Sequence, residues 1–163
     1  MRALGIAVFC IFLGATEATA RSVFESAKHL YAVMDLRENL LKECVKQDPA
    51  NKAKYGAEIA RYRQQTKTLN DKVRQMIIAE VPSNPREHSI GVIAKWSAAE
   101  SQRNISFQLQ PQHRAQFMDK CSYIIDSSHR PRSNVTKAQH NAIMGLPEDE
   151  WPADVRAINT WKP

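Results

Sequence analysis

The sequence has few glycines and few cysteines, and it lacks the motifs of common catalytic sites. Among its 163 residues are 5 glycines and 3 cysteines, and aromatic residues make up 7%. It contains no G-x-S-x-G, no H-E-x-x-H and no glycine-rich phosphate loop. Its serines, histidines and acids show no spacing typical of a triad or a carboxylate pair. The sequence therefore predicts a protein that is not an enzyme.

Long apolar runs are absent except at the N-terminus. There, Arg2 precedes the run ALGIAVFCIFLGA, and the small residues Ala18 and Ala20 follow it. A short basic region, an apolar stretch too brief to span a bilayer comfortably and an A-x-A ending are typical of a secretory signal. We expect a signal peptide over residues 1–20 and a secreted or periplasmic mature chain with no stable membrane span. An uncleaved membrane anchor is the alternative.

Dense clusters of basic residues are also absent, although the chain is basic. The formal net charge is +6 and the sequence pI is about 9.4. Such a balance suits an acidic partner, an anionic surface or nucleic acid. The Lys and Arg residues are scattered, however, and no aromatic residues alternate with them. We interpret the charge as a solvated helical surface and expect no nucleic-acid partner.

Helical periodicity dominates the rest of the chain. Residues 23–46 carry an apolar stripe at steps of three and four, interrupted only by Arg37: Val23, Ala27, Leu30, Met34, Leu41 and Cys44. A second helix, from about 50 to 80, has strict 4-3-4-3-4-3 spacing: Tyr55, Ile59, Tyr62, Thr66, Leu69, Val73 and Met76. Two prolines in VPSNPREHS end it.

A third helical segment runs from near Ser89 to residue 121, with Pro111 as a kink or a restart. Its first part has the apolar positions Ile90, Ile93, Trp96 and Ala99, and its second part has Phe117, Cys121, Ile124 and Ile125. Pro111 fits the first turn of a helix, with Gln110 near the cap. The fold class we predict is all-α. It is an antiparallel bundle of three to four helices over residues 21–129, formed by a long helical hairpin and a kinked third helix.

The last part of the chain, residues 130–163, contains prolines and tryptophans in place of a clear period. We expect a short helix around VTKAQHNAIM and then an irregular, extended tail. Trp151 and Trp161 could fold this tail back onto the bundle.

Only two cysteines, Cys44 and Cys121, remain after the predicted cleavage. Two cysteines in an exported protein usually pair, whereas free thiols or a metal pair are the alternatives. At about 1.5 Å rise per residue, an up-down-up path returns Cys121 to the level of Cys44. We therefore predict a Cys44–Cys121 disulfide, which would stabilise the fold by about 4 to 5 kcal/mol in the chain-entropy model.

Two residue pairs could hold a divalent transition metal, the only cofactor that we consider. Glu25 and His29 are four residues apart, as are His140 and Met144, so each pair shares one helix face. Such pairs also arise by chance, and methionines commonly fill helical cores. Metal binding and a purely structural role both stay open.

The stretch LQPQHRAQF, residues 109–117, resembles the L-T-P-x-Q-R-x-x-F pattern of a group of periplasmic helical proteins. These are the heavy-metal-resistance and LTxxQ envelope-stress proteins. The resemblance implies long antiparallel helices behind a signal peptide, often in a dimer, and a non-enzymatic role as metal sensor, metal-binding protein or holdase. The chain departs from the pattern at Gln110, where threonine is typical, and at His113, where glutamine is typical.

Our functional hypothesis is an exported binding protein, metal-responsive or involved in envelope stress, with a protein partner and with a homodimer as an open question. The alternative is an immunity or inhibitor protein that binds a secreted toxin. The candidate partner-binding residues are His113, Trp151 and Trp161. A secreted eukaryotic protein is a third option, because Asn104 and Asn134 begin glycosylation sequons.

Overall fold

The computed structural model describes residues 22–79, 86–126, 135–144 and 146–162. The predicted signal peptide and the boundary that we placed between residues 129 and 130 lie outside these ranges. The described residues form α-helices and one short 3-10 helix, with no strand among them. The elements are α1 Val23–Gln47, η1 Pro49–Asn51, α2 Lys52–Ala79, α3 Arg86–Gln108, α4 Pro111–Asp126, α5 Lys137–Met144, α6 Pro147–Glu150 and α7 Pro152–Thr160. The all-α prediction is confirmed.

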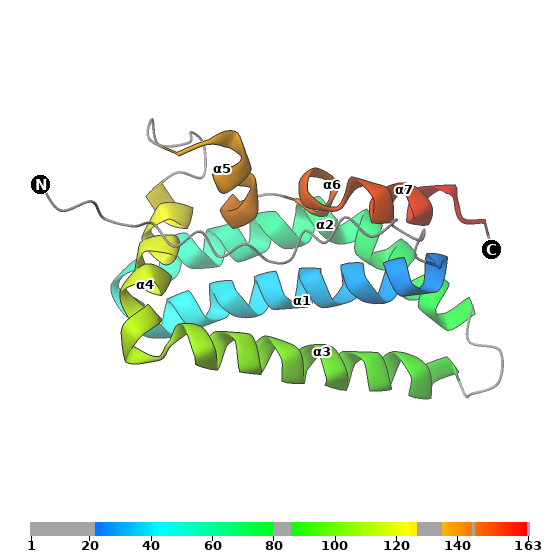
Figure 1. Ribbon diagram of the computed structural model, residues 1–163, viewed down its shortest axis with the longest axis horizontal. Helices are drawn as coiled ribbons and strands as arrows, with labels where there is room; N and C mark the ends of the chain where they lie inside the picture. The colour runs from blue at the N-terminus through cyan, green and yellow to red at the C-terminus, as the bar shows by residue number, and fades with distance from the viewer. Residues whose placement is uncertain (1–21, 80–85, 127–134, 145, 163) are drawn as a thin grey trace, which may run out of the picture.

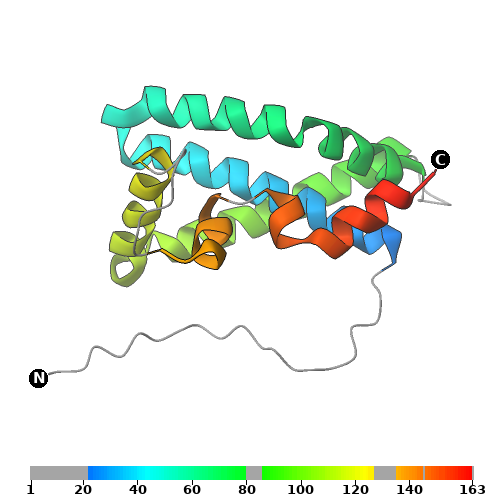
Figure 2. The same cartoon turned by 90° about the horizontal axis from the view of Figure 1, so that it is seen from above.

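Helix α1 is the centre of the bundle. It packs against α2, α3 and α7 (Figures 1 and 2). The chain runs along α1, returns along α2 and runs back along α3, which is the predicted up-down-up path (Figure 1). Helix α4 then crosses the end of the bundle, and α5 to α7 lead back along α1 and α2. The C-terminal helices thus cover a side of α1 that α2 and α3 leave free.

The apolar stripes of α1 and α2 form most of the core. Their buried members in the largest cluster are Ala27, Leu30, Met34, Leu69, Val73, Met76 and Ile77. Arg37, which seemed to interrupt the α1 stripe, lies on the same buried face, and its Nε is shielded from solvent. Burial lowers the pKa of its guanidinium. The α1 stripe is therefore continuous, with one basic side chain included in it.

The third segment is two separate helices rather than one kinked helix. Helix α3 ends at Gln108, and α4 starts at Pro111, whose missing N–H is not needed in a first turn. The amides of His113 and Arg114 donate to the carbonyl of Gln110, both at 2.9 Å. The predicted stripe of α4 is buried at Phe117, Cys121 and Ile124.

The predicted inner stripe of α3 is wrong in part. Ile93 is buried, but Trp96 is 45% exposed and Ala99 is exposed. Ser97 and Ser101 take the inner positions, where both donate to Asp35 of α1, at 2.7 and 3.5 Å. Hydrogen bonding of these small polar residues allows α3 to approach α1 without a continuous apolar face.

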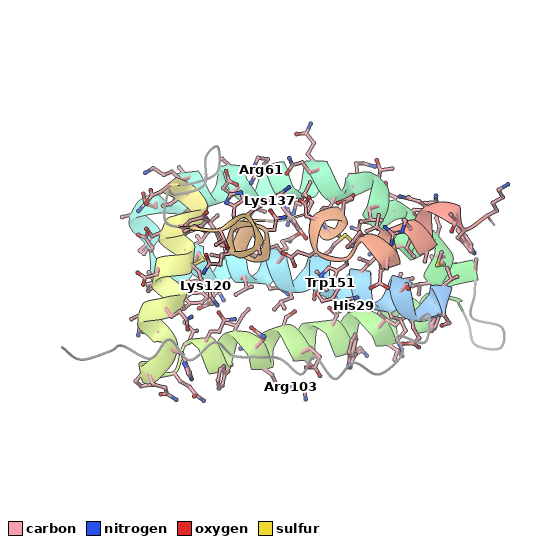
Figure 3. The ribbon with its side chains drawn as sticks, turned by 45° about the horizontal axis from the view of Figure 1, so that its top comes forward. His29, Arg61, Arg103, Lys120, Lys137 and Trp151 are labelled. Carbon is pink, nitrogen blue, oxygen red and sulfur yellow. A yellow bond between two sulfur atoms is a disulfide. The ribbon has the colours of Figure 1, made fainter. Side chains whose placement is uncertain are left out.

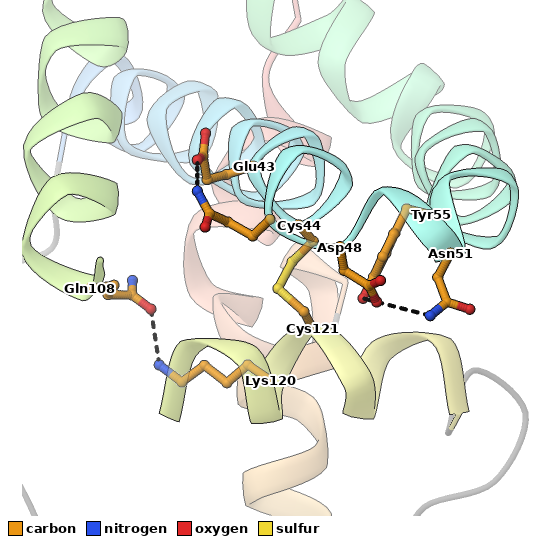
Figure 4. Close-up of a disulfide and its surroundings, with 9 residues drawn as sticks. Glu43, Cys44, Asp48, Asn51, Tyr55, Gln108, Lys120 and Cys121 are labelled. Carbon is orange, nitrogen blue, oxygen red and sulfur yellow. Dashed lines mark hydrogen bonds between the residues drawn. A yellow bond between two sulfur atoms is a disulfide. The ribbon is translucent and has the colours of Figure 1, made fainter. Parts of the chain in front are cut away.

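The predicted disulfide is present. Cys44 of α1 and Cys121 of α4 are bonded with an S–S distance of 2.00 Å and a Cα–Cα distance of 5.6 Å (Figure 4). Both cysteines are buried together with Tyr55 and Phe117. The Tyr55 hydroxyl donates to Asp48 at 3.1 Å, and burial together with this carboxylate raises the pKa of Tyr55 to about 12. The cross-link fixes α4 across the end of α1.

Most of the described part of the C-terminal segment, residues 135–144 and 146–162, is helical, so our prediction of an irregular tail is wrong there. Pro147 and Pro152 lie in the first turns of α6 and α7, where proline is favoured. Val155 and Ile158 of α7 are buried in the main core cluster. Trp151 and Trp161 pack partly buried against the same cluster, as the fold-back prediction requires.

Candidate protein-binding groove

The two residues of the first predicted metal-binding pair, Glu25 and His29, contact different partners within the protein. The Glu25 carboxylate accepts from Lys28 Nζ at 3.0 and 3.2 Å. The ring of His29 turns to α7, where its Nδ1 lies 2.7 Å from Asp154 Oδ2. No group of three or more His, Cys, Asp or Glu residues suited to a metal occurs in the described part of the chain.

Of the second predicted metal-binding pair, only the side chain of His140 is described. His140 Nδ1 lies 2.8 Å from the Tyr123 hydroxyl, and the two rings meet nearly edge to face. The side chain of Met144 lies outside what the structure describes. His140 thus attaches α5 to α4, and metal binding by either pair stays a prediction.

A polar cluster attaches α7 to the start of α1. Asp154 is buried and accepts from the Ser26 hydroxyl at 2.8 Å while its other oxygen contacts His29. The ring of Trp151 meets that of His29 edge to face at 4.4 Å between centroids (Figure 3). Because Ser26 donates to a carboxylate rather than to an imidazole base, the trio does not have the arrangement of a catalytic triad. Its role is to hold α7 in place.

The three predicted partner-binding residues are in two different settings. Trp151 and Trp161 are half-buried because they pack against the main core cluster. His113 instead stacks on Phe107, with 4.5 Å between ring centroids, at the corner where α3 meets α4. Phe107 is 51% exposed. Of the three, His113 therefore lies beside an accessible apolar surface.

That surface continues onto α1, which carries a second apolar stripe. Val33, Leu36 and Leu40 are half-buried at steps of three and four residues. Toward α3, Val33 and Leu36 border a hollow of about 440 Å³ together with Phe107. Toward α6, all three side chains border a smaller hollow of about 100 Å³ that Pro147 helps to enclose. The two hollows share Val33 and Leu36, and we call them together the α1 groove. Its apolar lining is Ala32, Val33, Leu36 and Leu40 of α1, Phe107 of α3 and Pro147 of α6, and Tyr62 of α2 with Ser101 and Asn104 of α3 also lines it.

Both ends of the α1 groove are closed by fixed elements. At one end α7 covers α1 at His29, one turn before Val33. At the other end α4 crosses α1 through the disulfide, and Arg114 donates to Gln47 at 2.8 Å. Figure 3 shows α1 between α3 and the α6–α7 segment, with α4 across one end. The groove is therefore preformed.

The exposed charged side chains of the groove, Glu100 and Arg103, stand at its rim. Glu100 and Arg103 of α3 form an ion pair on one side. On the α6 side Glu150 and Arg37 line the smaller hollow. Burial raises the pKa of Glu150, and the nearby Arg37 guanidinium partly offsets that rise. An apolar floor with a charged rim is the arrangement of grooves that bind amphipathic helices.

A polar hollow of about 250 Å³ lies between α1 and α2 but suits a ligand less well. Arg63 makes two hydrogen bonds to Glu38, at 3.0 and 2.6 Å. These bonds lower the pKa of Glu38 to about 2. Asp35 accepts from Ser97 and Ser101. Since these carboxylates already have partners within the protein, the hollow offers a ligand little further hydrogen bonding.

The groove was not predicted, although the sequence carries a signal for it. His29, Val33, Leu36 and Leu40 follow 4-3-4 spacing, which is a second helical stripe beside the core stripe of α1. A helix with two apolar stripes must contact something on both sides. The walls could not be predicted, because Pro147 and Phe107 come from distant parts of the chain.

Comparison of the chain with protein-family models, curated proteins and solved structures gave no match. The resemblance of residues 109–117 to the heavy-metal-resistance and LTxxQ proteins stays a prediction. Among the helices of the described ranges, none has the length and apolarity needed to cross a membrane.

Proposed function

We propose that the protein is an exported, non-enzymatic binding protein whose α1 groove takes an apolar helical segment of a partner protein. The observation that carries this proposal is the half-buried stripe of Val33, Leu36 and Leu40, left open between two fixed ends. Burying these side chains against a partner would contribute about 25 cal/mol for each Å² of apolar surface removed from water.

A helical segment fits the groove best. From Ala32 to Leu40 the floor is about 12 Å long at 1.5 Å per residue, which matches two turns of a partner helix. Such a helix would place apolar residues at i, i+3, i+4 and i+7 on the floor. Its polar flank would meet Glu100, Arg103 and Glu150 at the rim. An inhibitor of a secreted toxin could use the same surface, with the segment supplied by the toxin.

The test is selection from a displayed library of amphipathic helical peptides on the oxidised protein. Peptides that bind the groove should lose at least about 30-fold in affinity to Leu36→Asp, since losing a hot spot at the centre of an interface costs about 2 kcal/mol or more and an aspartate adds a buried charge. Val23→Asp is the matched control, because Val23 is 37% exposed on the same helix and lines no part of the groove. Equal affinity for wild type and Leu36→Asp would overturn the proposal.

Export is supported by the buried disulfide, because such bonds persist in oxidising compartments. Expression of the full sequence in a secreting host, followed by mass spectrometry of the released protein, checks it. The expected product starts at Arg21. A product that keeps Met1 and stays inside the cell would contradict export.

The metal-responsive hypothesis has a separate test. The Nδ1 atoms of His29 and His140 lie beside Asp154 and Tyr123, so a metal would have to bind at the other ring nitrogen. Calorimetry with zinc, copper, nickel and cobalt measures whether the oxidised protein binds any of these ions at micromolar concentration. Binding that His29→Ala or His140→Ala abolishes would support the metal hypothesis, and the absence of any binding would favour a protein ligand.

A further inference from the structure

The smaller hollow of the α1 groove differs in chemistry from the larger one. Its volume of about 100 Å³ is more than a single water molecule needs, so the end of one side chain fits there. Apolar side chains of α1 and Pro147 of α6 form part of its lining, and three polar side chains complete it: Arg37, Tyr62 and Glu150. These three belong to α1, α2 and α6, so the fold brings them together from distant parts of the chain.

Tyr62 brings a buried hydroxyl group to this hollow. Its side chain is only 6% exposed, and its ring packs in a core cluster with Leu41, Tyr123 and Ile124. The hydroxyl makes no hydrogen bond with any residue that the structure describes. Burial raises the pKa of Tyr62, so the hydroxyl stays protonated and can both donate and accept. A ligand group that reaches it would gain a hydrogen bond that the folded chain does not supply.

Two half-buried charges of opposite sign, Arg37 and Glu150, also line the smaller hollow. Of the charges that act on the Tyr62 hydroxyl, these two act most strongly, which places the hydroxyl on the α6 side of α1. Glu150 is also influenced by the neighbouring side chain of Trp151. A ligand group in the hollow therefore meets a positive charge, a negative charge and a hydroxyl.

We infer that the smaller hollow takes the side-chain amide of a glutamine or asparagine on the bound helix. The inference rests on the proposed function, because it names a residue of the helical segment that the α1 groove takes. An amide carries an acceptor oxygen and two N–H donors without a net charge. Its oxygen accepts from the Tyr62 hydroxyl while an N–H group donates to the Glu150 carboxylate.

Other side chains match the hollow less well. A carboxylate would face Glu150 and a lysine ammonium would face Arg37, and like charges repel each other strongly in a half-buried site. A methionine or leucine of similar size would cover the Tyr62 hydroxyl and the Glu150 carboxylate without bonding to either. Covering polar groups without bonding them is costly, so a site of this kind rejects the apolar analogue.

Substitution of a selected helical peptide, one position at a time, tests the inference on the full oxidised protein. At one position on the flank that faces α6, glutamine or asparagine should bind at least about tenfold more tightly than methionine, glutamate or lysine. Tyr62→Phe keeps the buried ring and removes only the hydroxyl, so the preference for the amide over methionine should fall about threefold or more. The absence of such a position, or a preference that Tyr62→Phe leaves unchanged, would overturn the inference.

Tyr31→Phe is the matched control for this substitution. Tyr31 is half-buried and lines the polar hollow between α1 and α2 but no part of the α1 groove, so both affinities should stay unchanged. Circular dichroism would verify that the variants keep their helices. Leu36→Asp separates the two proposals. If it weakens every peptide while the amide has no advantage, the groove stands and this inference fails; if it weakens none, the proposed function fails as well.

Glu150→Gln gives an independent test of the charge in the hollow. Because this change removes the negative charge and keeps Arg37, a peptide with glutamate at the same position should bind the variant about tenfold more tightly than the wild type. Glu148→Gln is the control, because Glu148 is exposed on the same helix and lines no part of the groove. A glutamate peptide that binds Glu150→Gln no better than Glu148→Gln would overturn the pairing of the amide with Glu150.

Discussion

The two ends of the α1 groove are closed in different ways. At the α4 end a buried disulfide joins Cys44 to Cys121, with Tyr55 and Phe117 packed around it. At the α7 end the closure is non-covalent: Val155 and Ile158 enter the core, and Asp154 contacts Ser26 and His29. The disulfide keeps α4 attached to α1 even when the surrounding structure unfolds locally. Helix α7 is held only by packing and hydrogen bonds, so it can detach and bind again. The closure at the α7 end therefore depends on packing and hydrogen bonds alone.

Removing the disulfide should have the largest effect on stability. In the chain-entropy model a cross-link between residues 77 positions apart stabilises the folded state by about 4 to 5 kcal/mol. The double substitution Cys44→Ser and Cys121→Ser should lower the free energy of unfolding by about that amount in urea titrations. A loss below about 1 kcal/mol would show that packing around α4, rather than the cross-link, closes this end.

A core truncation in α7 should have the next largest effect, and a local one. Ile158 is fully buried, so Ile158→Ala should cost about 2 to 4 kcal/mol. Because α7 is attached only non-covalently, we expect the loss to appear as faster hydrogen exchange in α7 while α2 keeps its protection. Arg156→Ala, at an exposed position of the same helix, is the control. Equal loss of protection in both helices would show that the two ends unfold together.

The polar cluster at the α7 end should contribute less to the stability of the fold than the buried side chain of Ile158. Asp154→Asn keeps the shape of the side chain but removes the charge opposite His29 and weakens the acceptor for Ser26. A buried polar group that loses its partner costs about 1 to 3 kcal/mol, so we expect a loss in that range. Limited proteolysis of the C-terminal segment checks this. Unchanged cleavage would assign the attachment of α7 to apolar packing alone.

The smallest effect should come from the ion pair between the two ends. Glu38 and Arg63 join α1 to α2 near the surface, so Glu38→Gln should cost at most about 1 kcal/mol at pH 7. Because the folded-state pKa of Glu38 is lowered to about 2, this contribution is present above the unfolded pKa and is lost as the pH falls through about 2. Urea titrations of both forms at pH 7 and pH 2 check it. A difference that persists at pH 2 would rule out the charge as its origin.

The same comparison explains what the sequence could predict. The α4 end was predicted correctly, because the disulfide follows from two cysteines and from helix lengths set by a strict period. The α7 end was not, because Pro147 and Pro152 allow either a break or the start of a helix. Trp96 was assigned to the core on local spacing, but Ser97 and Ser101 take that face through hydrogen bonds to Asp35, a residue 62 positions from Ser97. Hydrogen bonds between residues so far apart in the sequence produce no periodic pattern from which they could be predicted.

The most direct test of the α1 groove is methyl NMR of the oxidised protein during titration with a selected helical peptide. We expect saturable shifts of the Val33, Leu36 and Leu40 methyl groups, while the methyl groups of Leu69 and Val73 in the core stay unchanged. The Leu36→Asp protein should need far more peptide to show the remaining shifts. Shifts confined to other surfaces, with the three groove residues unaffected at saturation, would contradict the claim that this groove is the binding site.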